Sequence, residues 1–181
     1  DPQRDRSADD HGAEQIPATG PVILAANHGG MLPIDGAMLY FDVLTHTNPP
    51  RIPRPVADGF VPFLPILGTL FARAGVVAGS RQNVHRLLER GELLLVFPEG
   101  VDGIGKPSRA RYELQAWSVG HAELAIRHRA LVVPTSLVGP DEQWPELTRI
   151  SGFHLFGAPY LPIPYLPFPL PVRYHIRYGA P

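Results

Sequence analysis

A histidine and an aspartate that follow a short apolar run are the residues of this chain best suited to acid–base chemistry. The apolar run at 21–26 leads directly into Asn27-His28, and Asp35 lies a short loop further along. A neutral imidazole can accept a proton from an alcohol, and a nearby carboxylate can fix its tautomer and stabilise the imidazolium. The Gly-x-Ser-x-Gly motif of serine hydrolases is absent from the sequence. The pattern therefore predicts a base and its orienting acid, with the substrate's own hydroxyl as the nucleophile.

A purely structural role explains the same two residues. Asp35 can cap the helix that follows it, and His28 can be a loop histidine whose hydrogen bonds are satisfied within the fold. The spacing alone is compatible with both interpretations.

A second apolar run ends in an acidic residue in the same way. The segment 93–97 leads into Pro98-Glu99-Gly100, and a glutamate between proline and glycine is held on a stiff turn. There it can accept hydrogen bonds from substrate hydroxyls, or it can be an exposed turn carboxylate. Two strands that end in polar groups indicate an active site at one edge of an α/β sheet.

Basic residues supply candidate contacts for an anion. Arg81 follows a Gly-Ser pair at a predicted helix start, where free backbone N–H groups favour a phosphate. Lys106, Arg109 and Arg111 lie in the loop after the Pro-Glu-Gly turn, where they can meet a phosphate or an acidic carrier. Each of them can equally be a solvated surface cation. The other histidines show no spacing typical of metal ligands, so no metal site is predicted.

The elements expected to hold these residues alternate between strand and helix. This order favours an α/β fold in which a largely parallel mixed sheet is flanked by helices. We expect 1–19 to be a polar N-terminal arm and 20–181 to be one domain. The proline-rich run at 159–171 is expected to be extended. The expected strands are 21–26, 54–58, 93–97, 131–138 and 172–178, and the expected helices are 35–45, 60–74, 80–90, 114–129 and a short one near 142–150.

Composition and charge exclude several classes of function. The net charge of -1 does not indicate nucleic acid as a partner. Cysteine is absent, so the chain has neither disulfides nor thiolate chemistry. No uninterrupted apolar stretch is long enough to predict a membrane span, and no signal peptide is visible. The segments 60–71 and 160–170, rich in aromatic, aliphatic and proline residues, are candidate lipid-facing surfaces.

The ordered set of motifs resembles the glycerolipid acyltransferase family, which includes lysophosphatidate and glycerol-3-phosphate acyltransferases. The motifs are Asn27-His28 with Asp35, Gly79-Ser80-Arg81, Phe97-Pro98-Glu99-Gly100, and Val132-Val133-Pro134 with Gly139. The resemblance covers about 20–180. It implies transfer of an acyl chain from a thioester, acyl-CoA or acyl-carrier protein, to a lipid hydroxyl, with that co-substrate and no other cofactor or metal.

The resemblance also assigns roles to residues. It implies that His28 is the general base, that Asp35 is its partner and that Arg81 contacts the phosphate of an acceptor. It implies further that Phe97-Pro98-Glu99-Gly100 binds the acceptor through Glu99, and that Pro134 lines the acyl or acceptor site. Access to such substrates implies peripheral association with a membrane surface, which we expect at its cytoplasmic face.

Two departures from the family pattern bear on the dyad and on the acceptor. The family has four residues between histidine and aspartate, whereas six stand between His28 and Asp35. This longer loop resembles the branch related to mono- and diacylglycerol acyltransferases. Val101-Asp102-Gly103 stands where the family has threonine or alanine, arginine and serine. This weakens a phosphate-bearing acceptor and leaves a neutral lipid alcohol open.

Two alternative functions follow from the same residues. If the longer loop breaks the dyad, the chain is a catalytically inactive protein that binds lipid or acyl chains. If His28 activates water instead of an alcohol, the chain is an acyl hydrolase. Acyl transfer and acyl hydrolysis both form an oxyanion. Its expected hydrogen-bond donors are backbone N–H groups near Gly29-Gly30 or Gly100.

Overall fold

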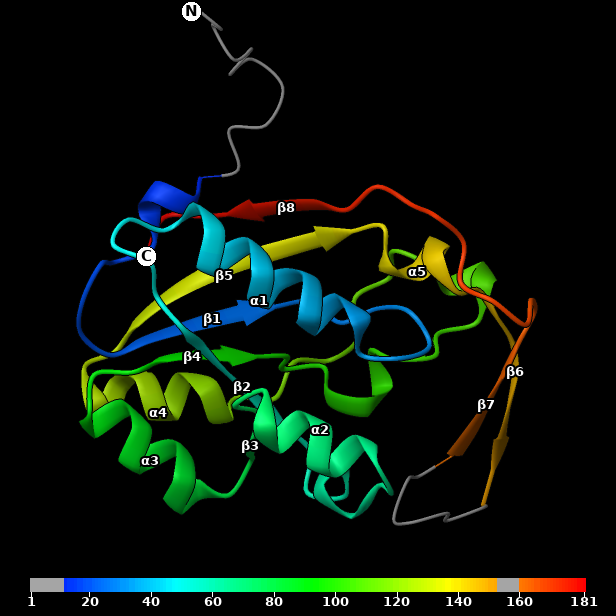
Figure 1. Ribbon diagram of the computed structural model, residues 1–181, viewed down its shortest axis with the longest axis horizontal. Helices are drawn as coiled ribbons and strands as arrows, with labels where there is room; N and C mark the ends of the chain where they lie inside the picture. The colour runs from blue at the N-terminus through cyan, green and yellow to red at the C-terminus, as the bar shows by residue number, and fades with distance from the viewer. Residues whose placement is uncertain (1–11, 153–159) are drawn as a thin grey trace, which may run out of the picture.

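A six-stranded sheet with the strand order β3-β2-β4-β1-β5-β8 organises the molecule (Figure 1). The computed structural model describes residues 12–152 and 160–181. Every neighbouring pair is parallel except β5 with β8. The expected α/β fold with a largely parallel mixed sheet is therefore confirmed. The strands are β1 (Val22–Ala26), β2 (Pro53–Ala57), β3 (Val77–Ala78), β4 (Leu93–Val96), β5 (Leu131–Val138) and β8 (His175–Tyr178).

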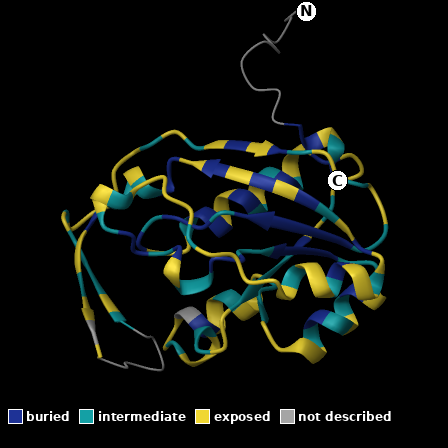
Figure 2. Cartoon of the chain, turned by 180° about the vertical axis from the view of Figure 1, so that it is seen from behind, coloured by how far each residue is buried: buried dark blue, intermediate teal, exposed yellow. Residues whose placement is uncertain are grey.

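The two faces of the sheet pack against different helices. Successive side chains of a strand point to opposite faces. Leu24 of β1 belongs to the core that includes α1 (Ile34–His46), whereas Ile23 belongs to the core that includes α3 (Arg81–Glu89) and α4 (Gly120–His128). All five residues of β1 are buried, as expected of a strand covered on both faces. Figure 2 shows these buried strands in the middle of the layers.

The remaining elements are short. Helix α5 and the antiparallel pair β6-β7 lie beyond the carboxyl ends of the central strands (Figure 1). None of the helices within the described part of the chain is long and apolar enough to cross a membrane. The short elements are η1 (Ala13–Gln15), η2 (Val61–Phe63), α2 (Leu67–Arg73), η3 (Gly100–Asp102), η4 (Ser108–Ala110), α5 (Pro140–Gln143), β6 (Glu146–Ser151) and β7 (Tyr160–Pro164).

The structure describes only part of the segment expected to be a polar arm, 1–19. Residues 1–11 lie outside the described residues, but 12–19 are not a free arm. Ala13 and Ile16 are buried and belong to the same core cluster as Tyr178 of β8. Two apolar side chains in an otherwise polar segment are thus enough to dock it beside the last strand.

The helix expected over 60–74 is divided into η2 and α2. Pro65 lies between the two pieces and has no N–H to continue a helix. Ile66, the next residue, has a left-handed φ of 64°. A left-handed residue interrupts the path of a right-handed helix, although this conformation is unfavourable for a branched side chain, and the helix starts again at Leu67.

Two further helices are shorter than expected. Only Gly120–His128 of the range 114–129 is helical, because the preceding backbone bonds elsewhere: Ser118 N donates to the carbonyl of Pro98 at 2.9 Å. The helix expected near 142–150 ends at Gln143, and from Glu146 the chain becomes β6 and pairs with β7.

Candidate active site

Three polar residues meet where the carboxyl ends of β1, β4 and β5 lie side by side. β1 pairs with β4 on one side and with β5 on the other, so the segments that follow these strands are neighbours. His28 follows β1, Glu99 follows β4 and Asp141 follows β5. In open α/β sheets this edge, where neighbouring connections leave in different directions, is the usual place for a ligand.

His28 and Asp35 form a direct buried contact. Nδ1 of His28 lies 2.5 Å from Oδ2 of Asp35, and the two residues are 6% and 0% exposed. The longer loop between them does not separate the pair, because α1 begins at Ile34 and presents Asp35 from its first turn. A carboxylate in this position accepts the Nδ1 proton, which leaves Nε2 as the basic nitrogen of the neutral ring.

The imidazole ring is stacked on one face, and the start of its side chain is closely confined. Phe97 stacks on it with ring centroids 4.0 Å apart and an angle of 15° between the planes. Gly103 passes so close that an added Cβ would lie 2.7 Å from the Cβ of His28. Nε2 has no hydrogen-bond partner among residues 12–152 and 160–181, and it is not among their fully buried unpaired atoms. The basic nitrogen therefore has no partner within the described residues and is not completely enclosed, although the side chain is only 7% exposed.

Three consecutive backbone N–H groups hold the loop that carries the histidine. The backbone N–H groups of Gly29 and Gly30, expected to be oxyanion donors, already donate to the carboxylates of Asp35 and Asp141. The N–H of Gly100 is also occupied, since it donates to the carbonyl of Phe97 at 3.0 Å. Each of the three N–H groups has a different acceptor: His28 N donates to Glu99 Oε1 (3.0 Å), Gly29 N to Asp35 Oδ2 (3.0 Å) and Gly30 N to Asp141 Oδ1 (2.9 Å).

Glu99 is an internal anchor in this arrangement. It is 4% exposed, and its second oxygen, Oε2, accepts the backbone N–H of Gln115 at 2.9 Å. Both of its oxygens therefore accept backbone N–H groups, one from the histidine loop and one from the segment before α4. That binding explains why the segment before α4 is not helical.

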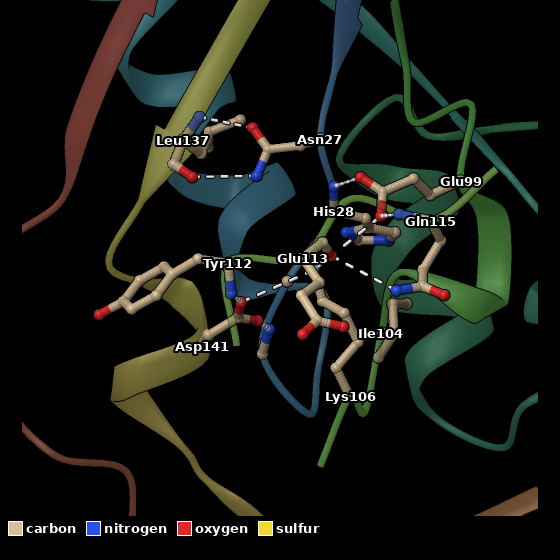
Figure 3. A network of polar contacts seen from close by, with 12 residues as sticks. Asn27, His28, Glu99, Ile104, Lys106, Tyr112, Glu113, Gln115, Leu137 and Asp141 are labelled. Atoms are coloured by element: carbon tan, nitrogen blue, oxygen red, sulfur yellow. Dashed lines mark hydrogen bonds and ion pairs between the residues drawn. The ribbon is translucent and has the colours of Figure 1, made fainter. Parts of the chain in front are cut away.

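Lys106 lies between two of the carboxylates (Figure 3). Its Nζ is 3.9 Å from Oε2 of Glu99 and 3.6 Å from Oδ2 of Asp141, and it donates to the carbonyl of Glu113 at 3.1 Å. Asp141 also accepts the backbone N–H of Tyr112 at 3.0 Å. The ammonium thus compensates negative charge that would otherwise be buried without a partner.

A cleft of about 160 Å³ lies against the residues next to the dyad, and neither His28 nor Asp35 is among those that line it. It borders the residues on either side of His28, and the carboxyl end of β5 forms its opposite wall. Six of the residues that line it are Asn27, Gly29, Lys106, Tyr112, Leu137 and Asp141.

Asn27 joins the two walls of the cleft. Its side-chain nitrogen donates to the carbonyl of Leu137 at 2.9 Å, and its side-chain oxygen accepts the N–H of Leu137 at 2.7 Å. The amide thus takes the place of a peptide group between β1 and β5. The asparagine of the Asn-His pair is therefore a structural residue that fixes where β1 releases the histidine.

A half-buried phenol responds to the negative charge of the site. Burial raises the pKa of Tyr174 above the ordinary value, and the charges of Asp35 and Asp141 raise it further. Its hydroxyl donates to Oε1 of Gln143 at 2.7 Å. Tyr174 is therefore a neutral hydrogen-bond donor behind the site.

Two of the predicted binding residues are not brought to this centre. Arg81 is exposed at the start of α3, and β3, which precedes it, is the edge strand of the sheet. Pro134 lies within β5 opposite Ala25, with its carbonyl bonded to the N–H of Gly179 at 2.8 Å. Their roles in binding stay predictions, whereas the structure gathers the histidine, its aspartate and the Phe-Pro-Glu-Gly turn at one place.

Sequence reasoning missed Asp141 and the central position of Lys106. Asp141 follows Gly139-Pro140 directly after the apolar run 131–138. An apolar run that ends in an acidic residue at a turn, as at Glu99, was a usable signal. Lys106 lies in an irregular loop and has no such signal. Among the described residues no cluster of three or more His, Asp or Glu side chains is arranged to hold a metal ion.

Several known proteins are similar to this sequence over most of its length. An uncharacterized protein of Mycobacterium tuberculosis is 40% identical over 182 residues, which cover 94% of this chain and 50% of that protein. An uncharacterized protein of Mycobacterium leprae is 38% identical over 180 residues, with 94% and 49% covered. A Bos taurus protein named "DGAT1/2-independent enzyme synthesizing storage lipids" is 28% identical over 170 residues, with 92% and 50% covered. The chain spans about half the length of these relatives.

The family model described as "Acyltransferase" matches residues 7–138. This range includes β1 with His28, α1 with Asp35, and β4 with the Phe-Pro-Glu-Gly turn. The match covers more than half of the chain, and the site's geometry agrees with the motifs that carry it. The chain belongs to the acyltransferase family.

Proposed function

We propose that this chain moves a fatty acyl group from an acyl thioester, acyl-CoA or acyl-carrier protein, to a hydroxyl of a glycerolipid or related lipid alcohol. One observation carries the proposal: a buried imidazole lies 2.5 Å from a carboxylate through Nδ1, and its two chain neighbours, Asn27 and Gly29, line a cleft. This is the arrangement that a general base for an alcohol requires.

The proposed reaction uses His28 first as a base and then as an acid. The acceptor hydroxyl gives its proton to Nε2 as its oxygen attacks the thioester carbonyl carbon. Asp35 stabilises the imidazolium, and the tetrahedral intermediate then collapses with cleavage of the carbon–sulfur bond. The leaving thiolate takes the proton from His28, so the products are an ester and a free thiol. The thioester is already activated, and the proposed step uses no other cofactor.

The charges around the cleft support an uncharged acceptor. Lys106 lines the cleft, but its ammonium lies within ion-pair distance of Glu99 and Asp141. Arg81, the residue expected to meet a phosphate, begins the helix after the edge strand. A phosphate would therefore enter a site with little free positive charge. The name of the cattle relative, which refers to storage lipids, agrees with an uncharged lipid alcohol.

Peripheral contact with a membrane surface is part of the proposal. Large apolar side chains are exposed on η2 and α2 and in the run after β7. Phe63 is 72%, Ile66 84% and Phe168 76% exposed. Aromatic and aliphatic side chains of this kind enter the boundary between headgroups and acyl chains.

A thiol-release assay tests the reaction class. The chain contains no cysteine, so a thiol reagent reports only coenzyme A set free from acyl-CoA. Release that depends on diacylglycerol in mixed micelles, with formation of the ester, supports transfer. If thiol is released and free fatty acid is formed when no acceptor is present, the result contradicts transfer and favours a hydrolase. Binding of acyl-CoA without release, whether the acceptor is a neutral or a phosphorylated glycerolipid, contradicts it in favour of a non-catalytic binder.

A further inference from the structure

The chain has a single lysine, and that lysine is buried at the candidate active site. Lys106 is one of 16 basic residues, and all the others are arginines. Its side chain is only 3% exposed. A fully buried lysine is rare unless it is paired, and its compact ammonium carries three donors on one atom, unlike the planar guanidinium of arginine. The position therefore calls for a point charge.

The ammonium links the two carboxylates that hold the ends of the histidine loop. Glu99 accepts the N–H of His28, and Asp141 accepts the N–H of Gly30. Nζ of Lys106 lies between these carboxylates, 3.9 Å from one and 3.6 Å from the other (Figure 3). With Asp35 on the N–H between them, three negative groups surround three consecutive residues.

We propose that Lys106 is a positioning residue: its ammonium keeps Glu99 and Asp141 in place, and they set the direction of the His28 imidazole. The inference rests on the function proposed above. Without the ammonium, three carboxylates around one short loop repel one another in a poorly solvated site. The loop then shifts, and Nε2 no longer meets the acceptor hydroxyl at the productive angle.

The backbone around Lys106 is held by contacts that do not involve its side chain. Gly105 N donates to the carbonyl of Gly30 at 2.8 Å. Arg149 of β6 donates to the carbonyl of Gly105 at 2.6 Å, and Tyr160 of β7 donates to the carbonyl of Ile104 at 2.7 Å. A change of the lysine side chain therefore leaves the loop anchored, and the charge can be tested apart from the fold.

The absence of cysteine allows the charge to be removed and restored at one atom. Lys106→Cys creates a unique thiol on the wall of the cleft. Alkylation with 2-bromoethylamine rebuilds a side chain of nearly the same length with an ammonium, and 2-bromoethanol builds its uncharged counterpart. Lys106→Cys is expected to lower kcat about a hundredfold, as a small misplacement of a catalytic group does. KM should change much less, because the lost interaction acts in the transition state.

The two alkylated forms decide the question. The aminoethyl form should recover most of kcat, and the hydroxyethyl form should not. Arg127→Met, which removes an exposed charge on α4, is the control and should behave as wild type. Equal kcat values for the two alkylated forms, or wild-type kcat in Lys106→Met, would overturn the proposal.

A second measurement needs no substrate. The Nδ1 proton of His28, in its short contact with Asp35, should give a far-downfield proton NMR signal that disappears in His28→Gln. The signal should shift or broaden in Lys106→Met and in the hydroxyethyl form, and stay in place in the aminoethyl form. An unchanged signal in both uncharged forms contradicts the positioning role. Missing turnover in the wild type contradicts the proposed function instead, so the two failures can be told apart.

Discussion

At the scale of single residues, the dyad depends on one carboxylate that serves several donors. Asp35 is fully buried, and its two oxygens accept Nδ1 of His28, the N–H of Gly29 and the N–H of Gly36. Because both oxygens accept backbone N–H groups, the carboxylate has no freedom to rotate. It therefore fixes the tautomer of the imidazole and its direction together.

Replacing this carboxylate by an amide tests that role. In Asp35→Asn the side-chain nitrogen can face Nδ1 as a donor, which leaves the ring proton on Nε2 and removes the base. We expect kcat for acyl transfer to fall about a thousandfold or more, the order of loss seen when an orienting aspartate is replaced elsewhere. The measurement is the acceptor-dependent release of thiol from acyl-CoA.

A matched control lies on the same helix. Asp42 accepts the hydroxyl of Tyr178 at 2.7 Å and has no contact with His28. Asp42→Asn is expected to alter thermal stability and to leave kcat close to wild type. Similar kcat values for the two aspartate variants would contradict the role of Asp35.

At the scale of elements, the sequence predicts the parts of the site better than their meeting. The strand ends at His28 and Glu99 and the helix with Asp35 were all evident from apolar runs and turn residues. That the loops after β4 and β5 reach His28 and Gly30, respectively, depends on strand order, because β4 and β5 are the two neighbours of β1. Strand order is a property of the assembled sheet and leaves no local pattern.

Arg81 does not lie at the candidate active site, and the reason is again strand order. The arginine follows a strand and begins a helix, as the sequence predicts, but β3 lies at the edge of the sheet.

In the segment before α4 the local prediction itself is wrong. Its apolar residues predict a helix, yet the N–H of Gln115 is bound by Glu99, so a tertiary contact overrides local preference.

The first residue of β6 gives a prediction about stability and pH. Glu146 is 4% exposed, and its Oε2 is a buried oxygen without a hydrogen bond in the described part of the chain. Burial raises the pKa of Glu146, and the attraction of Arg149 only partly opposes this shift. The folded state therefore binds this proton more tightly than the unfolded state, and stability is lost as the pH rises through the folded pKa.

Glu146→Gln removes that charge while it keeps the shape of the side chain. We expect the variant to be more stable than wild type by about 1 kcal/mol at neutral pH, because it removes a buried charge that Arg149 compensates only in part. The difference should shrink as the pH falls through the acid range, where the wild-type carboxyl is protonated. Thermal unfolding of both proteins from acid to neutral pH measures this difference in stability. A variant that is less stable than wild type by the same amount at every pH would disprove the prediction.

At the scale of the whole molecule, exposed apolar side chains accompany the site. Helix α2 and the pair β6-β7 lie toward the end of the molecule where the central strands finish (Figure 1). A surface that entered a lipid boundary there would bring the cleft close to a lipid acceptor and shorten its path to His28.

Charges placed on this surface should weaken binding to membranes. We expect the double variant Phe63→Asp with Ile66→Asp to lose most of its flotation with liposomes, because buried apolar area drives interfacial binding. Ile126→Asp is the control, since Ile126 is 81% exposed on α4, nearer the amino ends of the strands (Figure 1). Equal flotation of both variants and the wild type, with all three folded, would rule out this surface.

The central claim is that one imidazole takes the proton of a lipid alcohol during acyl transfer. The most direct test compares kcat of the wild type and His28→Ala for diacylglycerol-dependent thiol release, with thermal unfolding and acyl-CoA binding as checks on the fold. The predicted result is a loss of about two to four orders of magnitude in kcat with binding retained, the usual contribution of a general base. A folded His28→Ala protein that still transfers acyl groups at close to the wild-type rate would contradict the account.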